Sequence, residues 1–150
     1  MSDAAEELKS LHTTLIDARN GYEEALKDAE GKGLTPLFRQ MMMLHGEHAD
    51  VIALELRVLG EKADDKGSFL STVHRTIMSV RSLFGGLDES ILPGLIDGEK
   101  RLLGYYDEAI AATKSSPAVQ TKLIAQRARL DAKIGEMEEL KSQVSERAKA

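Results

Sequence analysis

Along almost the whole chain, apolar residues recur at three- and four-residue steps, in segments that glycine and proline separate. This spacing lines up apolar side chains on one face of an α-helix, and no segment shows the two-residue alternation of a half-buried strand. The stripes and their ends predict helices over residues 3–30, 35–60, 68–84, 88–113 and 117 to near residue 150. The sequence therefore predicts an all-α protein.

The expected helix ends rest on residues with known positional preferences. Thr35 and Ser116 each precede a proline, which is the pattern of an N-cap followed by the first helical residue. Gly60 is placed to end the second helix, because glycine tolerates the left-handed conformation found there. Asp88 is the expected N-cap of the fourth helix, and Pro93 is expected to kink its first turn.

The first four helices are predicted to form a four-helix bundle over residues 1–115, followed by a separate amphipathic helix in residues 116–150. The stripe of this last helix consists of Leu123, Leu130, Met137 and Val144, which recur every seven residues, and Ile134. Such a stripe needs a cover, because the helix is hardly stable alone in water. With the four-helix core already closed, we expect a homodimer or larger homo-oligomer that uses this helix. Arg127 and Lys141 would stand at seam positions and weaken the pairing.

Composition excludes several classes of protein. There is no cysteine, so disulfides, zinc fingers and thiol nucleophiles are excluded. The formal net charge of -5 argues against a nucleic-acid surface, which normally has a basic face. The acidic N-terminal segment lacks the apolar core of a signal peptide, and no apolar run reaches the roughly 20 residues of a membrane span. We therefore expect a cytoplasmic protein without a membrane or nucleic-acid partner.

A few polar side chains fall on apolar faces. At about 100° per residue, His45 lies in the middle of its stripe with His48 at the flank, and Glu99 lies at the centre of another. Burying an unpaired carboxylate is costly, so an inward Glu99 needs a partner. In one interpretation Arg19, a histidine or a tyrosine hydroxyl supplies it, and the layer is structural. In the other, His45, His48 and Glu99, joined by His74, bind zinc or iron.

Further landmarks are spread over the first four predicted helices. They are Asp17 to Ala25 (DARNGYEEA), Leu37–Phe38, Leu59–Gly60, Gly67–Ser68, His74–Arg75, Gly98–Glu99 and Tyr106. In these residues the chain resembles an uncharacterised bacterial four-helix-bundle family, a domain-of-unknown-function group placed in the ferritin-like superfamily. The resemblance spans residues 5–113 and leaves the last helix outside. It implies a ferritin-like fold and no activity, because the family has none to transfer.

The pattern of ferritin-type iron chemistry is missing. Di-iron bundles carry Glu on two helices and Glu-x-x-His on the other two. This chain has His45-x-x-His48 on one helix and Glu99-x-x-Leu102 on another. The first helix turns Arg19 and Tyr22 inward, and neither is a carboxylate. One inward carboxylate cannot neutralise two irons, so iron oxidation and storage are not expected.

The direction of the third helix is left open. The link 61–67 spans at most about 25 Å, close to the length of helix 68–84, so a crossover is barely feasible, whereas short links are typical of antiparallel neighbours. In a crossover bundle, His45 and Glu99 share one layer. In an up-and-down bundle they are expected to be roughly 9 Å apart along the axis. The resemblance favours the crossover.

Two functions are carried forward from the sequence. The first is a non-catalytic bacterial bundle that acts through self-association or partners, with a role under stress as one form. It needs no cofactor, and no set of residues meets the requirements of a catalytic site. The alternative is a metal-binding or redox protein of ferritin-like type, with zinc or iron held by His45, His48 and Glu99 inside the bundle.

Overall fold

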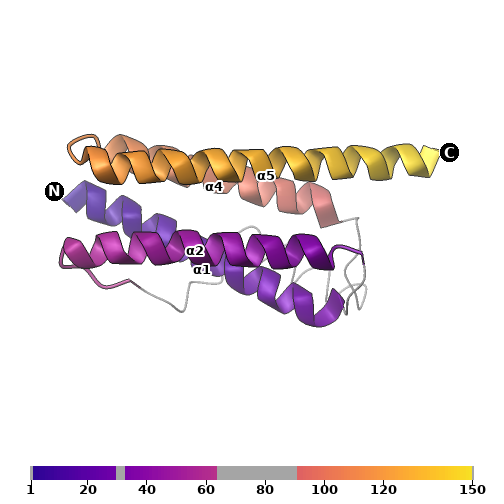
Figure 1. The fold of residues 1–150 in the computed structure, drawn as a ribbon, viewed down its shortest axis with the longest axis horizontal. Helices are drawn as coiled ribbons and strands as arrows, with labels where there is room; N and C mark the ends of the chain where they lie inside the picture. The colour runs from indigo at the N-terminus through magenta and orange to yellow at the C-terminus, as the bar shows by residue number, and fades with distance from the viewer. Residues whose placement is uncertain (1, 30–32, 64–90, 150) are drawn as a thin grey trace.

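A computed structural model describes residues 2–29, 33–63 and 91–149 of the chain. The helices, labelled as in Figure 1, are α1 (Ser2–Ala29), α2 (Thr35–Val58), α4 (Leu92–Ala112) and α5 (Pro117–Lys149). Over these residues the protein is all-helical, as predicted. None of the described helices is both long and apolar enough to cross a membrane. The predicted helix 68–84, His74 and the predicted cap Asp88 lie outside the described residues.

The ends of α2 follow the sequence prediction in one case and correct it in the other. The N-cap is Leu34, with no side-chain cap, and Thr35 is already helical. Pro36 lies in the first turn, where its missing N–H would have no helical partner. At the other end Gly60 has a φ of 78°, and the amide of Glu61 donates to the carbonyl of Leu56 at 2.9 Å. The glycine therefore ends α2 as expected.

The later helix starts also carry prolines. In the structure α4 begins at Leu92, so Pro93 lies in its first turn. A proline there removes only an N–H that would be unsatisfied anyway, so it gives no reason for the predicted kink. Helix α5 begins at Pro117 as predicted, and the amide of Gln120 donates to the carbonyl of Ser116 at 3.0 Å.

Contacts between side chains fix the directions of neighbouring helices. Lys9 near the start of α1 pairs with Glu61 just after α2 at 2.7 Å, so α1 and α2 are antiparallel. Helices α4 and α5 are antiparallel as well, because Lys100 pairs with Glu138 and Asp107 pairs with Arg127. Figure 1 shows the two pairs stacked as two layers.

Helices α2 and α4 run parallel to one another, which agrees with the up-and-down alternative and not with the favoured crossover between the second and third helices. α2 ends where α1 begins, whereas α4 begins at the opposite end of the bundle (Figure 1). The favoured crossover between the second and third helices, with a short turn into the fourth, would have made α2 and α4 antiparallel. In this parallel pair His45 and Glu99 lie ten and seven residues after the first residues of their helices. They therefore lie at similar heights and are in contact, so the separation of roughly 9 Å expected for an up-and-down bundle is wrong.

Helix α5 packs onto its own chain. Its side chains Leu123, Leu130, Ile134 and Met137 are buried in the same apolar core as those of α1, α2 and α4. Lys122 pairs with Glu55 of α2 at 2.6 Å, so α5 contacts α2 as well as α4. Each fully buried Leu or Met stabilises the fold by about 1.5–3 kcal/mol. The chain itself therefore covers most of the stripe for which a second chain was expected. The homo-oligomer and the division at residue 115 remain predictions.

Candidate functional site

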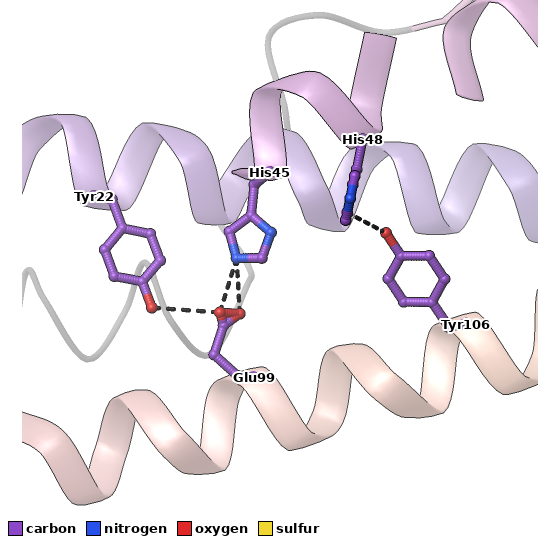
Figure 2. A network of polar contacts seen from close by, with 5 residues as sticks. All are labelled: Tyr22, His45, His48, Glu99 and Tyr106. Carbon is purple, nitrogen blue, oxygen red and sulfur yellow. Dashed lines mark hydrogen bonds and ion pairs between the residues drawn. The ribbon is translucent and has the colours of Figure 1, made fainter. Parts of the chain in front are cut away.

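Two polar clusters lie side by side inside the apolar core, between α2 and α4 (Figure 2). The Glu99 cluster consists of Tyr22 from α1, His45 from α2 and Glu99 from α4. The Tyr106 cluster consists of His48 from α2, Tyr106 from α4 and Gln126 from α5. All of these side chains are buried. Helical periodicity puts them there, because each lies on the apolar stripe of its own helix.

In the Glu99 cluster a carboxylate and an imidazole are both fully buried. His45 Nε2 lies 2.9 Å from Glu99 Oε1 and 2.8 Å from Oε2, so it donates to both oxygens of the carboxylate. The Tyr22 hydroxyl donates to Oε2 at 3.4 Å, and its ring stacks on that of His45. Burial and the neighbouring charge of Glu99 raise the pKa of Tyr22, which keeps the phenol protonated as a donor.

The predicted need of Glu99 for a partner is confirmed, and two of the three suggested partners supply it. They are a histidine and a tyrosine hydroxyl. Arg19 does not, because its guanidinium bonds the side-chain oxygen of Asn20 at 3.2 Å and 3.4 Å. A buried pair with good geometry offsets part of the large cost of taking both groups out of water.

The Tyr106 cluster is a closed loop of neutral hydrogen bonds. The Tyr106 hydroxyl donates to Gln126 Oε1 at 2.9 Å, and Gln126 Nε2 donates to the backbone carbonyl of His48 at 3.4 Å. Having given its proton to Gln126, the Tyr106 oxygen can only accept from His48 Nδ1, 3.2 Å away. His48 therefore carries its proton on Nδ1, and its Nε2 has a free lone pair.

Burial controls the protonation of this second cluster. It lowers the pKa of His48 to about 4, with smaller contributions from His45 and from Arg129, so this imidazole is neutral at pH 7. Burial, followed by the charge of Glu99, raises the pKa of Tyr106, which stays a phenol. The Tyr106 cluster thus holds no charge, whereas the Glu99 cluster holds a carboxylate.

In each cluster, one ring nitrogen of the histidine has no partner among the described residues. His45 Nδ1 and His48 Nε2 are buried and have no hydrogen-bond partner among the described residues. An unpaired buried polar atom costs about 1–3 kcal/mol, so such atoms are uncommon in native structures. Two of them on consecutive turns of α2 mark this as the place in the described core where a further atom could be bound.

The structure separates the three predicted metal ligands. Glu99 has both oxygens on His45 Nε2, and His48 belongs to the other cluster. Among the described residues, no group of three or more His, Cys, Asp or Glu is arranged to hold a metal ion. His74, the suggested fourth ligand, is not among them. The prediction of a metal site made of all three residues therefore stays a prediction.

Sequence reasoning missed Gln126. Leu123 and Leu130 are seven residues apart, so both residue 126 and residue 127 fall between them on the stripe. The prediction places Arg127 at the seam, but Gln126 is buried, and Arg127 pairs with Asp107 at 2.6 Å near the surface. The sequence did contain a signal for Gln126. Residues 126 and 127 both fit the stripe, and a neutral amide costs less to bury than a charged guanidinium.

The fold and the clusters define an all-helical bundle protein with a polar centre. The chain belongs to the family described as "Domain of unknown function (DUF2383)", which matches residues 3–112. The predicted membership of an uncharacterised family is thus confirmed. The match ends on the last residue of α4 and leaves α5 outside, as the resemblance did. No curated protein and no solved structure matches the chain.

Proposed function

We propose that this is a bacterial, cytoplasmic and non-catalytic protein of ferritin-like fold that acts by self-association through α5. The bacterial and cytoplasmic parts of the proposal are carried by the family resemblance and the sequence composition. The fold and the mode of action are supported by observations on the described helices.

The helix directions support the ferritin-like part. Ferritin-like folds are four-helix bundles with one long crossover connection, and their metal ligands project inward from all four helices. Here α1 is antiparallel to α2 and α4 to α5, while α2 and α4 run parallel, which is the set of directions that a single crossover between the two pairs would give. Tyr22, His45, Glu99 and Gln126 project inward from the four helices. In this proposal α5 is one of the helices of the bundle.

The clusters support the non-catalytic part. Di-iron bundles need four carboxylates to neutralise the two ions, whereas the two clusters contain the single carboxylate of Glu99. That carboxylate is fully buried and is already paired with His45. The geometry thus favours a structural centre over ferritin-type oxidation.

The observation that carries self-association is the length of α5. Helix α5 has 33 residues, against 21 in α4 and 24 in α2, and its C-terminal part extends past the ends of the other described helices (Figure 1). The seven-residue stripe continues into this extension. Met137 is fully buried, whereas Leu140 and Val144 are only partly covered. A second copy of the chain packed along this end would cover both.

Sedimentation of the full chain tests this proposal. We expect the wild type to form a dimer or larger oligomer, and Leu140→Glu with Val144→Glu to shift it to the monomer, because the seam gains charge. The matched control is Ser142→Glu with Ser145→Glu, which adds the same charge at exposed positions and should leave the assembly intact. A wild-type chain that is monomeric at high concentration overturns the proposal.

A second candidate function is metal binding inside the bundle, with zinc or iron and the residues His45, His48 and Glu99. It is favoured by one observation, the two buried ring nitrogens that have no partner among the described residues. Elemental analysis of untagged protein tests it. A stoichiometric metal that is lost on replacing His45 or His48 supports it, and metal-free protein from metal-rich medium counts against it.

A further inference from the structure

We propose that His45 and His48 together bind one monovalent copper ion, through His45 Nδ1 and His48 Nε2, while Glu99 and Tyr106 act as positioning residues. The inference rests on the second candidate function and changes its ligand set. Glu99 is no longer a ligand, because both of its oxygens face His45 Nε2 at 2.8–2.9 Å.

The first step is that both ring nitrogens are available. Both histidines are buried, at 0% and 3% exposure, and neither nitrogen has a partner among the described residues. A buried group without a partner points to an atom that completes it. A metal ion is one such atom, and imidazole nitrogen is among the commonest metal ligands.

The second step is that the partners from α4 set the proton positions that a metal site needs. Metal-binding histidines typically donate their other ring N–H to a carboxylate or another acceptor, which fixes the ring and its tautomer. His45 donates Nε2–H to the carboxylate of Glu99. His48 donates Nδ1–H to the oxygen of Tyr106, whose own proton is held by Gln126. Each ring therefore has one nitrogen in a hydrogen bond. In the proposed site the other nitrogen, Nδ1 of His45 and Nε2 of His48, supplies the lone pair.

The third step is placement. His45 and His48 are three residues apart on one face of α2, so they project from consecutive turns toward the same part of the core. Figure 2 shows His45 with Nε2 on Glu99 and its other ring nitrogen on the side of His48. The proposal places the ion between the two rings, with one nitrogen from each.

The last step is the choice of ion. Structural zinc takes four ligands, and iron in these bundles takes several carboxylates, whereas here two ring nitrogens are on offer. Monovalent copper can be held by two donors alone, and imidazole is a suitable ligand for copper. The charge balance of the site also favours a monovalent ion. The clusters contain one carboxylate, Glu99, which balances a single positive charge and leaves a divalent ion uncompensated in the core.

Titration of the full-length chain with Cu⁺ under anaerobic conditions, against a chromogenic chelator, tests the proposal. We expect one Cu⁺ per chain, and loss of this binding in His45→Gln and in His48→Gln. The matched control is His12→Gln, which replaces a buried histidine of α1 outside both clusters. Tyr106→Phe, which frees the His48 tautomer, should weaken binding by about tenfold. Circular dichroism shows which variants are folded.

X-ray absorption on the wild-type copper complex keeps the test independent of variant stability. Two nitrogen neighbours and no sulfur are expected. Absence of a one-to-one complex, sulfur in the copper shell, or full binding in a folded His45→Gln/His48→Gln protein overturns the proposal. Zinc or iron bound at the same histidines in preference to Cu⁺ also overturns it, while leaving the second candidate function standing. A crystal structure with only a water molecule between the rings, in protein that does not bind Cu⁺, overturns both.

Discussion

The two polar clusters are built from similar parts and differ in charge. Each joins a histidine of α2 to a side chain of α4 and includes a tyrosine. The Glu99 cluster buries a carboxylate and meets it with two donors. The Tyr106 cluster is neutral and closes on the backbone carbonyl of His48 through Gln126. The difference shows two ways to satisfy buried polar groups: a charge needs a dedicated partner, and a neutral group needs only a closed set of donors and acceptors.

The largest difference between the two clusters is expected when His45, the partner of the buried Glu99 carboxylate, is removed. We expect His45→Leu to lower the free energy of unfolding by about 3–5 kcal/mol, because the Glu99 carboxylate is left in the core with only the long bond from Tyr22. Urea denaturation, followed by circular dichroism, measures the loss. Replacing both members of the pair, in His45→Leu/Glu99→Leu, should recover most of it. A double variant as unstable as the single one would mean that packing, rather than charge, sets the cost.

A change in pH acts on the neutral cluster. His48 has its pKa lowered from the ordinary 6.5 to about 4. Between these two values the unfolded chain therefore takes up a proton that the folded chain does not, and stability falls as the pH is lowered. We expect a loss of about 2 kcal/mol between pH 7.5 and pH 5 from this group. His48→Gln should flatten the curve of unfolding free energy against pH in this range. An equal slope in wild type and variant would exclude His48 as the source.

The two tyrosines give a finer test. Tyr106→Phe breaks the neutral loop and leaves Gln126 Oε1 and His48 Nδ1 without their 2.9 Å and 3.2 Å partners, so we expect a loss of about 1–3 kcal/mol. Tyr22→Phe removes one bond of 3.4 Å from a carboxylate that keeps His45, and should cost about 1 kcal/mol or less. Thermal unfolding of the two variants side by side ranks them, and the reverse order would show that the charged cluster depends on its tyrosine.

The smallest effect is expected at the surface. Arg127 contacts both oxygens of Asp107, at 2.6 Å and 3.3 Å, against 2.9 Å and 2.8 Å between His45 and Glu99. Unlike the buried pair, Arg127 and Asp107 are in contact with solvent. Exposed pairs stabilise by about 0.2–1 kcal/mol, so Arg127→Ala should change the unfolding free energy by no more than that. Repeating the measurement at high salt should remove even this difference. A larger effect would place Arg127 in the core seam after all.

The sequence could predict that most residues of the two clusters turn inward, but not which of them meet. The positions of His45, His48, Glu99 and Tyr106 follow from helical periodicity within single helices, and all four are buried as expected. Their pairing depends on the relative direction of α2 and α4, which no local pattern encodes. The placement of Arg127 at the seam failed for a related reason, since Gln126 and Arg127 both fit the stripe and only the place of α5 in the bundle decides between them.

The large sequence separation between the residues of the two clusters has a consequence for folding kinetics. The Tyr22–Glu99 contact joins residues 77 apart, and the Gln126–His48 contact joins residues 78 apart. The loops that such contacts close are entropically costly, so we expect the α1–α2 and α4–α5 hairpins to form before the clusters do. Substitutions at Glu99 or Tyr106 should then speed unfolding and leave the refolding rate nearly unchanged in stopped-flow experiments. The polar centre would be the last part of the described core to assemble and the first to come apart.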